Sequence, residues 1–267
     1  VPTLKGHVAS VRLARYSPDG SRLVTTSDDK TARLWDPVGT KVVRALEGHA
    51  GPVVAAVFAG DGSARLLTWA EDDSTLRLWD SSTGEHLAAL THAGPVLSAT
   101  FTRDGRKVVS AGADDTIRTW DAGDGRQLGE PWQGTRGLQS VAGFAPGGRY
   151  VVFASRDSNG AQLFDIDGPK FIAELAGHSA PIDRVVFSPD GETVVTLSAD
   201  HTVKLWAARY GTELETIDPA SGAIASAEFS RDGARLVLAT ARDAWVYELD
   251  TVGVRSRLLA TLQGHSA

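Results

Sequence analysis

One repeated pattern constrains the fold of this chain more than any other feature of its sequence. The most regular copy runs from Gly6 to Asp36 and contains two alternating apolar segments, VRLARY and RLVTT, separated by the turn SPDG. A shorter apolar run, ARLW, follows a second polar turn, SDDKT. Period-two alternation broken by tight turns predicts antiparallel strands joined by hairpins. Each copy is therefore expected to form a β-meander.

Three markers, counted with their substituted copies, each indicate six repeats: a Gly-His pair before the first strand, an Asp-Gly turn after it, and a Trp-Asp pair ending the third strand. The first marker reads Thr91-His92 and Gly134-Thr135 in two repeats and is lost near Ala220. His7 and His265 are 258 residues apart, which equals six periods of 43. The third marker or its substitute recurs at Trp35-Asp36, Trp79-Asp80, Trp120-Asp121, Phe164-Asp165, Trp206-Ala207 and Tyr247-Glu248. The repeats are expected at about 6–47, 48–90, 91–133, 134–176, 177–219 and 220–264.

These dipeptides and turns together resemble WD40 repeats, over nearly the whole chain. The resemblance implies four strands per repeat and one propeller blade from each repeat. We therefore expect an all-β fold, a single domain over residues 1–267 that forms a β-propeller of six four-stranded antiparallel blades. Part of a seven-bladed or longer array is the alternative. Similarity to bacterial repeats of this kind, and the absence of Met, indicate a segment of a larger signalling protein.

Composition narrows the classes of function. The sequence has no Cys, which excludes disulfides, thiolate catalysis and thiolate metal sites. A formal net charge of -6 gives no reason to expect nucleic acid as a partner. No apolar run is long enough to span a bilayer, so we expect no membrane partner and a cytoplasmic location. Arg outnumbers Lys in a chain rich in Ala and Gly, which favours a bacterial origin.

The resemblance also implies a hydrogen-bonded polar set inside each regular blade, made of a His, a hydroxyl, an Asp and a Trp. Trp69 stands at the expected hydroxyl position of the second repeat, and the fourth and sixth repeats are expected to lack the set. The matching residues are His7, Thr25, Asp29 and Trp35; His49, Asp73 and Trp79; His92, Ser110, Asp114 and Trp120; His178, Thr196, Asp200 and Trp206.

A hydrolytic triad is the competing interpretation of one such set, since Ser110, His92 and Asp114 supply a nucleophile, a base and an orienting acid. Recurrence in several repeats favours a structural role instead, because buried polar groups must be satisfied in every blade. The marker His occurs once in each regular repeat, which places each of these imidazoles in a different blade, so no metal site is expected. No segment has the spacing of a nucleotide or calcium loop, and we expect no cofactor and no catalytic residue.

Members of this family usually bind partners across one face, and the resemblance implies which positions form it here. They are the third and fifth residues after the His and the residue before the turn Asp. The implied partner-binding residues are Ser10, Arg12, Asp28, Pro52, Val54, Asp72, Pro95, Leu97, Leu138, Ser140, Pro181 and Asp183. The sequence thus predicts a non-enzymatic scaffold or sensor module that binds a protein or peptide. A propeller enzyme with a hydrolytic or metal site near the central channel and a purely structural array are the alternatives.

The two chain ends compete for one position in a closed ring. Residues 1–6 resemble the end of an outer strand, while the segment RLLATLQGH already supplies an outer strand for the sixth blade. Six blades that close without an interlocking strand predict a monomer. An open seam predicts self-association through the terminal blades.

Overall fold

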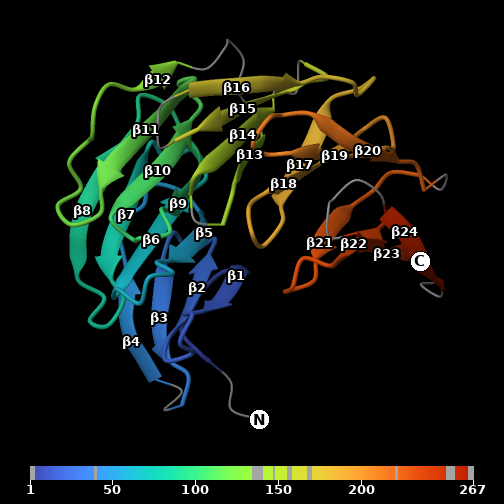
Figure 1. Cartoon of the computed structure of the whole chain (residues 1–267). Coiled ribbons are helices and arrows are strands. Elements are labelled where there is room, and N and C mark those ends of the chain that lie inside the picture. The colour runs from blue at the N-terminus through green and yellow to red at the C-terminus, as the bar shows by residue number, and fades with distance from the viewer. Residues whose placement is uncertain are drawn as a thin grey trace. The chain divides into compact units, whose positions relative to one another are not determined.

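The fold consists of small antiparallel sheets. The computed structural model describes residues 4–38, 41–133, 141–146, 148–154, 158–166, 170–219, 222–250 and 256–263. These residues form 24 strands in six four-stranded sheets (Figure 1). In every sheet the strands pair antiparallel with their neighbours along the chain, which confirms the predicted all-β fold of six four-stranded sheets. The described part of the chain contains no helix long and apolar enough to cross a lipid bilayer.

The chain divides into two compact units, Val1–Gly134 and Thr135–Ala267, each with three sheets. The first unit holds β1 (Val11–Tyr16), β2 (Leu23–Ser27), β3 (Ala32–Asp36) and β4 (Lys41–Leu46); β5 (Val53–Phe58), β6 (Arg65–Ala70), β7 (Thr75–Asp80) and β8 (His86–Thr91); β9 (Val96–Phe101), β10 (Lys107–Gly112), β11 (Thr116–Asp121) and β12 (Trp132–Gln133). Its third sheet ends in the two-residue strand β12, after the Gly-rich segment that follows β11.

The second unit is built in the same way from the last three repeats. It holds β13 (Val141–Phe144), β14 (Tyr150–Ala154), β15 (Ala161–Asp165) and β16 (Lys170–Leu175); β17 (Ile182–Phe187), β18 (Thr193–Ser198), β19 (Val203–Ala207) and β20 (Glu213–Ile217); β21 (Ser226–Phe229), β22 (Arg235–Ala239), β23 (Asp243–Leu249) and β24 (Ser256–Gln263). The outer strand expected from the segment RLLATLQGH is β24, which pairs with β23. Closure of the repeats into a ring stays a prediction.

The first hairpin of each regular repeat is stabilised by the turn that the sequence indicates. The hydroxyl of Ser17 donates to Asp19 Oδ1 at 2.6 Å, and the same oxygen accepts the amide of Ser21 at 3.0 Å. Gly20 has a φ of 72°, in the left-handed region that a side chain disfavours. Equivalent hydroxyl–carboxylate bonds close the turns at Asp104, Asp190 and Asp232. The turns therefore set where each first strand ends and each second strand begins.

Within each unit the core lies between successive sheets. All five residues of β2 and of β14 are buried, because a second strand is covered on both of its faces. Leu34 and Leu46 of the first sheet pack with Val53 and Ala56 of the second. A four-stranded sheet is too small to bury its own faces, so each one depends on its neighbours for stability.

Candidate functional site

A chain of polar side chains crosses the interior of the first sheet. His7 Nδ1 lies 2.8 Å from Asp29 Oδ2, and His7 Nε2 lies 2.7 Å from Thr25 Oγ1. Trp35 Nε1 donates to the same hydroxyl oxygen at 2.8 Å. Because a carboxylate only accepts, Nδ1 carries the proton of a neutral ring and Nε2 accepts from the Thr25 hydroxyl. The hydrogen bonds therefore all run in one direction: Trp35 donates to Thr25, Thr25 donates to His7, and His7 donates to Asp29.

The same arrangement occurs in the third and fifth sheets. His92 Nε2 lies 2.7 Å from Ser110 Oγ, which accepts from Trp120 at 2.8 Å. His178 Nε2 lies 2.8 Å from Thr196 Oγ1. The remaining contacts of these two sets join His92 Nδ1 to Asp114 at 3.2 Å, His178 Nδ1 to Asp200 at 2.9 Å, and Trp206 to Thr196 at 2.9 Å.

The second sheet contains a complete set, and the expectation that Trp69 occupies its hydroxyl position is wrong. Thr68 Oγ1 lies 2.8 Å from His49 Nε2 and accepts from Trp79 Nε1 at 2.8 Å. This repeat has one additional residue in each of its first two turns. Counting back from Asp73 with the spacing of the other repeats therefore gives Trp69, one position after Thr68. Trp69 is buried instead in the cluster between the second and third sheets.

Burial and hydrogen bonding set the charges of these groups. Burial would raise the pKa of Asp29, but hydrogen bonds from Thr31, His7 and two backbone amides outweigh it and hold the pKa well below its ordinary value. The balance is the same for Asp114, whose pKa is lowered to about 2. Burial lowers the pKa of His49, His92 and His178, against the opposing effect of their Asp partners. In the second, third and fifth sheets the sets therefore consist of neutral imidazoles bonded to ionised carboxylates at neutral pH.

Such a set can stabilise a sheet but is badly placed for hydrolysis. A nucleophile must reach its substrate, but Ser110 is fully buried, with 0% of its surface exposed. The Ser110 hydroxyl oxygen already accepts a hydrogen bond from Trp120, and the hydroxyl donates its hydrogen to His92 Nε2. No group of three or more His, Asp or Glu side chains that could hold a metal ion occurs among the described residues.

The fourth and sixth sheets replace the polar set with apolar side chains. In the fourth sheet Phe153 and Phe164 stand at the hydroxyl and Trp positions and meet edge to face, with ring centroids 6.0 Å apart. Phe171 of β16 contacts Phe164 in the same geometry at 5.6 Å. In the sixth sheet Leu238 and Tyr247 occupy the two positions, and both are buried. At these described positions, packed rings and aliphatic side chains stand where the other sheets have a hydroxyl bonded to an indole.

The described residues of the implied partner-binding face belong to the first, second, third and fifth sheets. They lie at one edge of these sheets, which we call the entry edge, where the first strand begins and the second ends. There the residue before the turn Asp donates its amide to the third residue after the His: Asp28 to Ser10 at 3.0 Å and Ala199 to Pro181 at 3.0 Å. In the second sheet Glu71, not Asp72, makes this bond to Pro52, at 2.8 Å. Asp72 is exposed in the following turn, with a φ of 55°.

Arg12 links the first two sheets at this entry edge. Its Nε donates to Asp28 Oδ1 at 2.5 Å, and its Nη2 lies 3.8 Å from Glu71 Oε2. The hydrogen bond from Arg12 to Asp28, and then the charges of Asp28 and Glu71, raise the pKa of the guanidinium. The Arg12 side chain is 46% exposed and open to a partner. One cation therefore faces two carboxylates, and the cluster is net negative.

The other implied positions differ in accessibility. Pro52, Val54, Pro95 and Leu97 are half-buried in the first unit, and Val54 also packs against the core. In the second unit Pro181 is half-buried. Asp183 is exposed. Leu138 and Ser140 lie outside the described residues.

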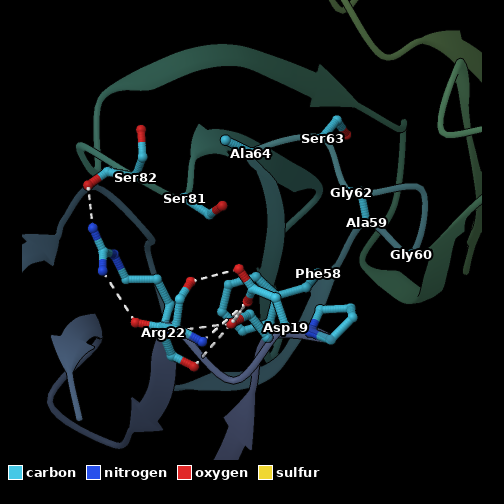
Figure 2. A pocket seen from close by; sticks show the side chains of 13 residues that line it. Asp19, Arg22, Phe58, Ala59, Gly60, Gly62, Ser63, Ala64, Ser81 and Ser82 are labelled. Carbon is cyan, nitrogen blue, oxygen red and sulfur yellow. Dashed lines mark hydrogen bonds between the residues drawn. The ribbon is translucent and has the colours of Figure 1, made fainter. Parts of the chain in front are cut away.

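Sequence reasoning missed a pocket at the opposite edge of the first two sheets, which we call the far edge (Figure 2). It has a volume of about 510 Å³ and lies between the turn after β1 and the turn after β5. Arg22 and Asp19 come from the first turn, and Phe58 and Ser82 come from the second sheet. Asp19 and Gly62, which belong to two of the repeated Asp-Gly turns, line the pocket. Because such turns recur along the chain, the repeat pattern does not show that a pocket opens between these two.

Comparison with known proteins identifies the repeats that contain a complete polar set as members of a known family. The WD40 family model, described as "WD domain, G-beta repeat", matches residues 1–36, 40–80, 84–121 and 169–207, more than half of the chain. These four stretches are the ones that contain a complete polar set. The eroded fourth and sixth repeats fall mostly outside them.

Several curated proteins are similar over most of the chain. Transcription initiation factor TFIID subunit 5 of Caenorhabditis elegans is 27% identical over 234 residues, which cover 86% of this chain and 35% of that protein. Nuclear distribution protein PAC1 of Arthroderma benhamiae is 29% identical over 247 residues, 80% of this chain and 53% of that protein. Pre-mRNA-processing factor 19 homolog 2 of Arabidopsis thaliana is 26% identical over 245 residues, 90% and 45% respectively. The chain thus spans between about a third and a half of the relatives it matches.

Proposed function

Because the chain belongs to the WD40 repeat family, we propose that it is a non-enzymatic module that binds a protein or peptide across the entry edge of its sheets. WD40 repeats generally mediate protein–protein interaction, and the similar proteins are named as a transcription initiation factor, a nuclear distribution protein and a pre-mRNA-processing factor. A place within a larger bacterial signalling protein, a cytoplasmic location and a monomeric state complete the proposal.

The observation that carries this proposal is the cluster of Arg12, Asp28 and Glu71. It joins two neighbouring sheets, remains accessible, and lies at the same edge as the half-buried apolar residues Val54 and Leu97. Arg is enriched at protein interfaces, and accessible apolar side chains beside it can form the centre of one. Because carboxylates outnumber cations there, a partner segment with one basic and one apolar side chain matches the edge in charge and in polarity.

The test maps the interface and then disrupts it. Chemical crosslinking with mass spectrometry on captured complexes should place the partner next to Ser10, Pro52 and Asp72. The double variant Arg12→Glu and Leu97→Asp should lower capture by about tenfold or more, as expected when an interface centre is disrupted.

Arg103→Glu is the matched control, since it introduces the same charge change in a turn at the far edge. It should leave capture unchanged. Crosslinks confined to the far edge, or equal retention of the partner by the double variant and the wild type, would refute the proposed face.

A further inference from the structure

The far-edge pocket between the first two sheets has the chemistry of a second, separate binding site. It is lined by the turns after β1 and β5 and by Ser81 and Ser82 after β7, and Figure 2 shows the Arg22 side chain extending toward Ser82. We propose that this pocket binds a carboxylate side chain of a peptide, with Arg22 as the anchor. The proposal does not depend on the entry edge, which lies at the opposite ends of the same strands.

The pocket exists because two neighbouring turns do not meet. In the next pair of sheets, a Cβ added at Gly105 would lie 1.9 Å from Asp61 Oδ2, so the Asp61 side chain fills the space between the turns. At Gly62, the equivalent position facing the first sheet, an added Cβ would meet nothing within 4 Å. Asp19 and its counterpart Asp61 are both bonded to Ser residues of their own turns, but no atom of Asp19 lies within 4 Å of the Cβ added at Gly62. The space that Asp61 fills is left open beside Asp19.

Arg22 lines this space with an incomplete set of hydrogen bonds. Its Nη1 donates to the carbonyl of Ser21 at 3.0 Å, and its Nη2 donates to the carbonyl of Ser82 at 3.5 Å, the limit for such a bond. Its Nε is buried and has no acceptor among the described residues. A carboxylate can bind a guanidinium with two parallel bonds, so a small rotation of the side chain would give Nε the acceptor it lacks and Nη2 a shorter bond than the one to Ser82.

The surroundings favour a carboxylate over a phosphate. Asp19 lies in the same pocket, and hydrogen bonds from Ser17 and Ser21 lower its pKa to about 2, so it is ionised. Arg22 is the one cation that lines the pocket, and a dianion would therefore carry an unbalanced charge beside Asp19. Phe58 and Ala59 form an apolar wall, which suits a neighbouring aliphatic side chain of the same peptide.

The experiment titrates the ¹⁵N-labelled chain with the blocked peptide acetyl-Ala-Glu-Leu-Ala-amide and follows the amide and Arg Nε resonances. Saturable shifts are expected at Ser21, Arg22, Gly62 and Ser82. The peptide with Gln in place of Glu should bind about tenfold more weakly or not at all, because it loses a charge-assisted pair. This comparison uses the unaltered protein, so it does not depend on the folding of a variant.

Two variants then assign the anchor. Arg22→Gln should abolish the saturable shifts. Arg65→Gln is the matched control, because Arg65 holds the same turn position in the second sheet and donates to the Gly105 carbonyl at 3.1 Å. It should leave binding unchanged, as should Arg12→Glu at the entry edge.

A third peptide, with phosphoserine in place of Glu, tests the preference for a carboxylate. Three results would overturn the inference: no saturable shift with the Glu peptide, equal affinity for the Gln peptide, or tighter binding of the phosphoserine peptide than of the Glu peptide. None of these results bears on partner capture through Arg12. Failure of this site and failure of the proposed function are therefore distinguishable.

Discussion

Two adjacent threonines on β2 show how differently neighbouring buried hydroxyls contribute to stability. Thr25 bonds both His7 and Trp35, whereas the Thr26 hydroxyl is buried without a partner among the described residues. Thr25→Val leaves a ring nitrogen and an indole N–H unsatisfied and should lower the free energy of unfolding by about 2–4 kcal/mol. Thr26→Val removes an unpaired polar group and should raise it by about 1 kcal/mol.

Urea unfolding followed by Trp fluorescence measures both changes. The two variants have the same shape change at neighbouring positions, so each is the control for the other. Equal destabilisation by both would show that the hydrogen-bond chain adds nothing beyond packing.

The buried histidines make stability depend on pH in a defined direction. The folded-state pKa values of His49, His92 and His178 lie below the ordinary value of 6.5, so the unfolded chain takes up protons first as the pH falls. Below about pH 6.5 the free energy of unfolding should therefore decrease, by up to about 1.4 kcal/mol per pH unit for each histidine. Above pH 7 these groups are neutral in both states and contribute no slope.

Below about pH 4 the carboxylates add a second loss of stability. The folded-state pKa values of Asp29, Asp73, Asp114 and Asp200 are lowered from 3.8, so their contribution is present above that value and disappears as they are protonated. Urea midpoints between pH 3 and pH 8 measure both ranges. His92→Gln should reduce the slope between pH 5 and pH 6.5, and an unchanged slope would contradict this assignment.

At the scale of sheets, two kinds of interior occur in one chain. The fifth sheet joins Trp206 to Thr196 through a hydrogen bond, while the fourth packs Phe164 against Phe153. In each sheet the residues around this position suit the side chain that is present, a hydroxyl acceptor for Trp206 and a phenyl ring for Phe164. Exchanging Trp and Phe should therefore destabilise both sheets. Trp206→Phe removes a donor from a satisfied chain, and Phe164→Trp buries an indole N–H beside a phenyl ring, each at about 1–3 kcal/mol.

Thermal unfolding of the two single variants tests this reciprocity. Leu163→Met, a change of similar volume at a buried neighbour of Phe164, is the control and should cost less than either exchange. A stabilising Phe164→Trp would show that the fourth sheet contains an acceptor for the indole.

At the scale of the whole molecule, the two compact units should fold separately. Every strand pairing and every hydrophobic cluster found in the described residues lies within Val1–Gly134 or within Thr135–Ala267. In repeat architectures the free energy of unfolding is approximately the sum of the stability of each repeat and of the interfaces between neighbouring repeats. Each half keeps its own three repeats and the interfaces between them.

The two halves produced as separate chains should each show dispersed amide resonances typical of β-structure and a cooperative thermal transition. A full chain carrying a specific protease site between the halves is the control, examined before and after cleavage. A disordered spectrum for either half would mean that its sheets depend on the other half.

The sequence by itself determined the sheets and most of the polar sets. Strand alternation, Asp-Gly turns and the His and Trp markers act over short distances, within one hairpin or one repeat, so a pattern read along the chain is sufficient to predict them. The resemblance to WD40 repeats, applied to the same markers, located the polar sets of the first, third and fifth repeats, where the spacing between hydroxyl and Trp is constant.

Only the tertiary structure decided which of two neighbouring residues takes the hydroxyl position in a repeat whose turns differ in length. In the second repeat, extra residues in two turns leave Thr68 or Trp69 as candidates, and strand pairing selects Thr68 because its side chain points to His49. The pairing of Arg12 with Glu71 and the opening beside Gly62 likewise depend on contacts between different sheets. Such contacts are set by how far a side chain reaches across a sheet interface, which the spacing of residues within one repeat does not encode.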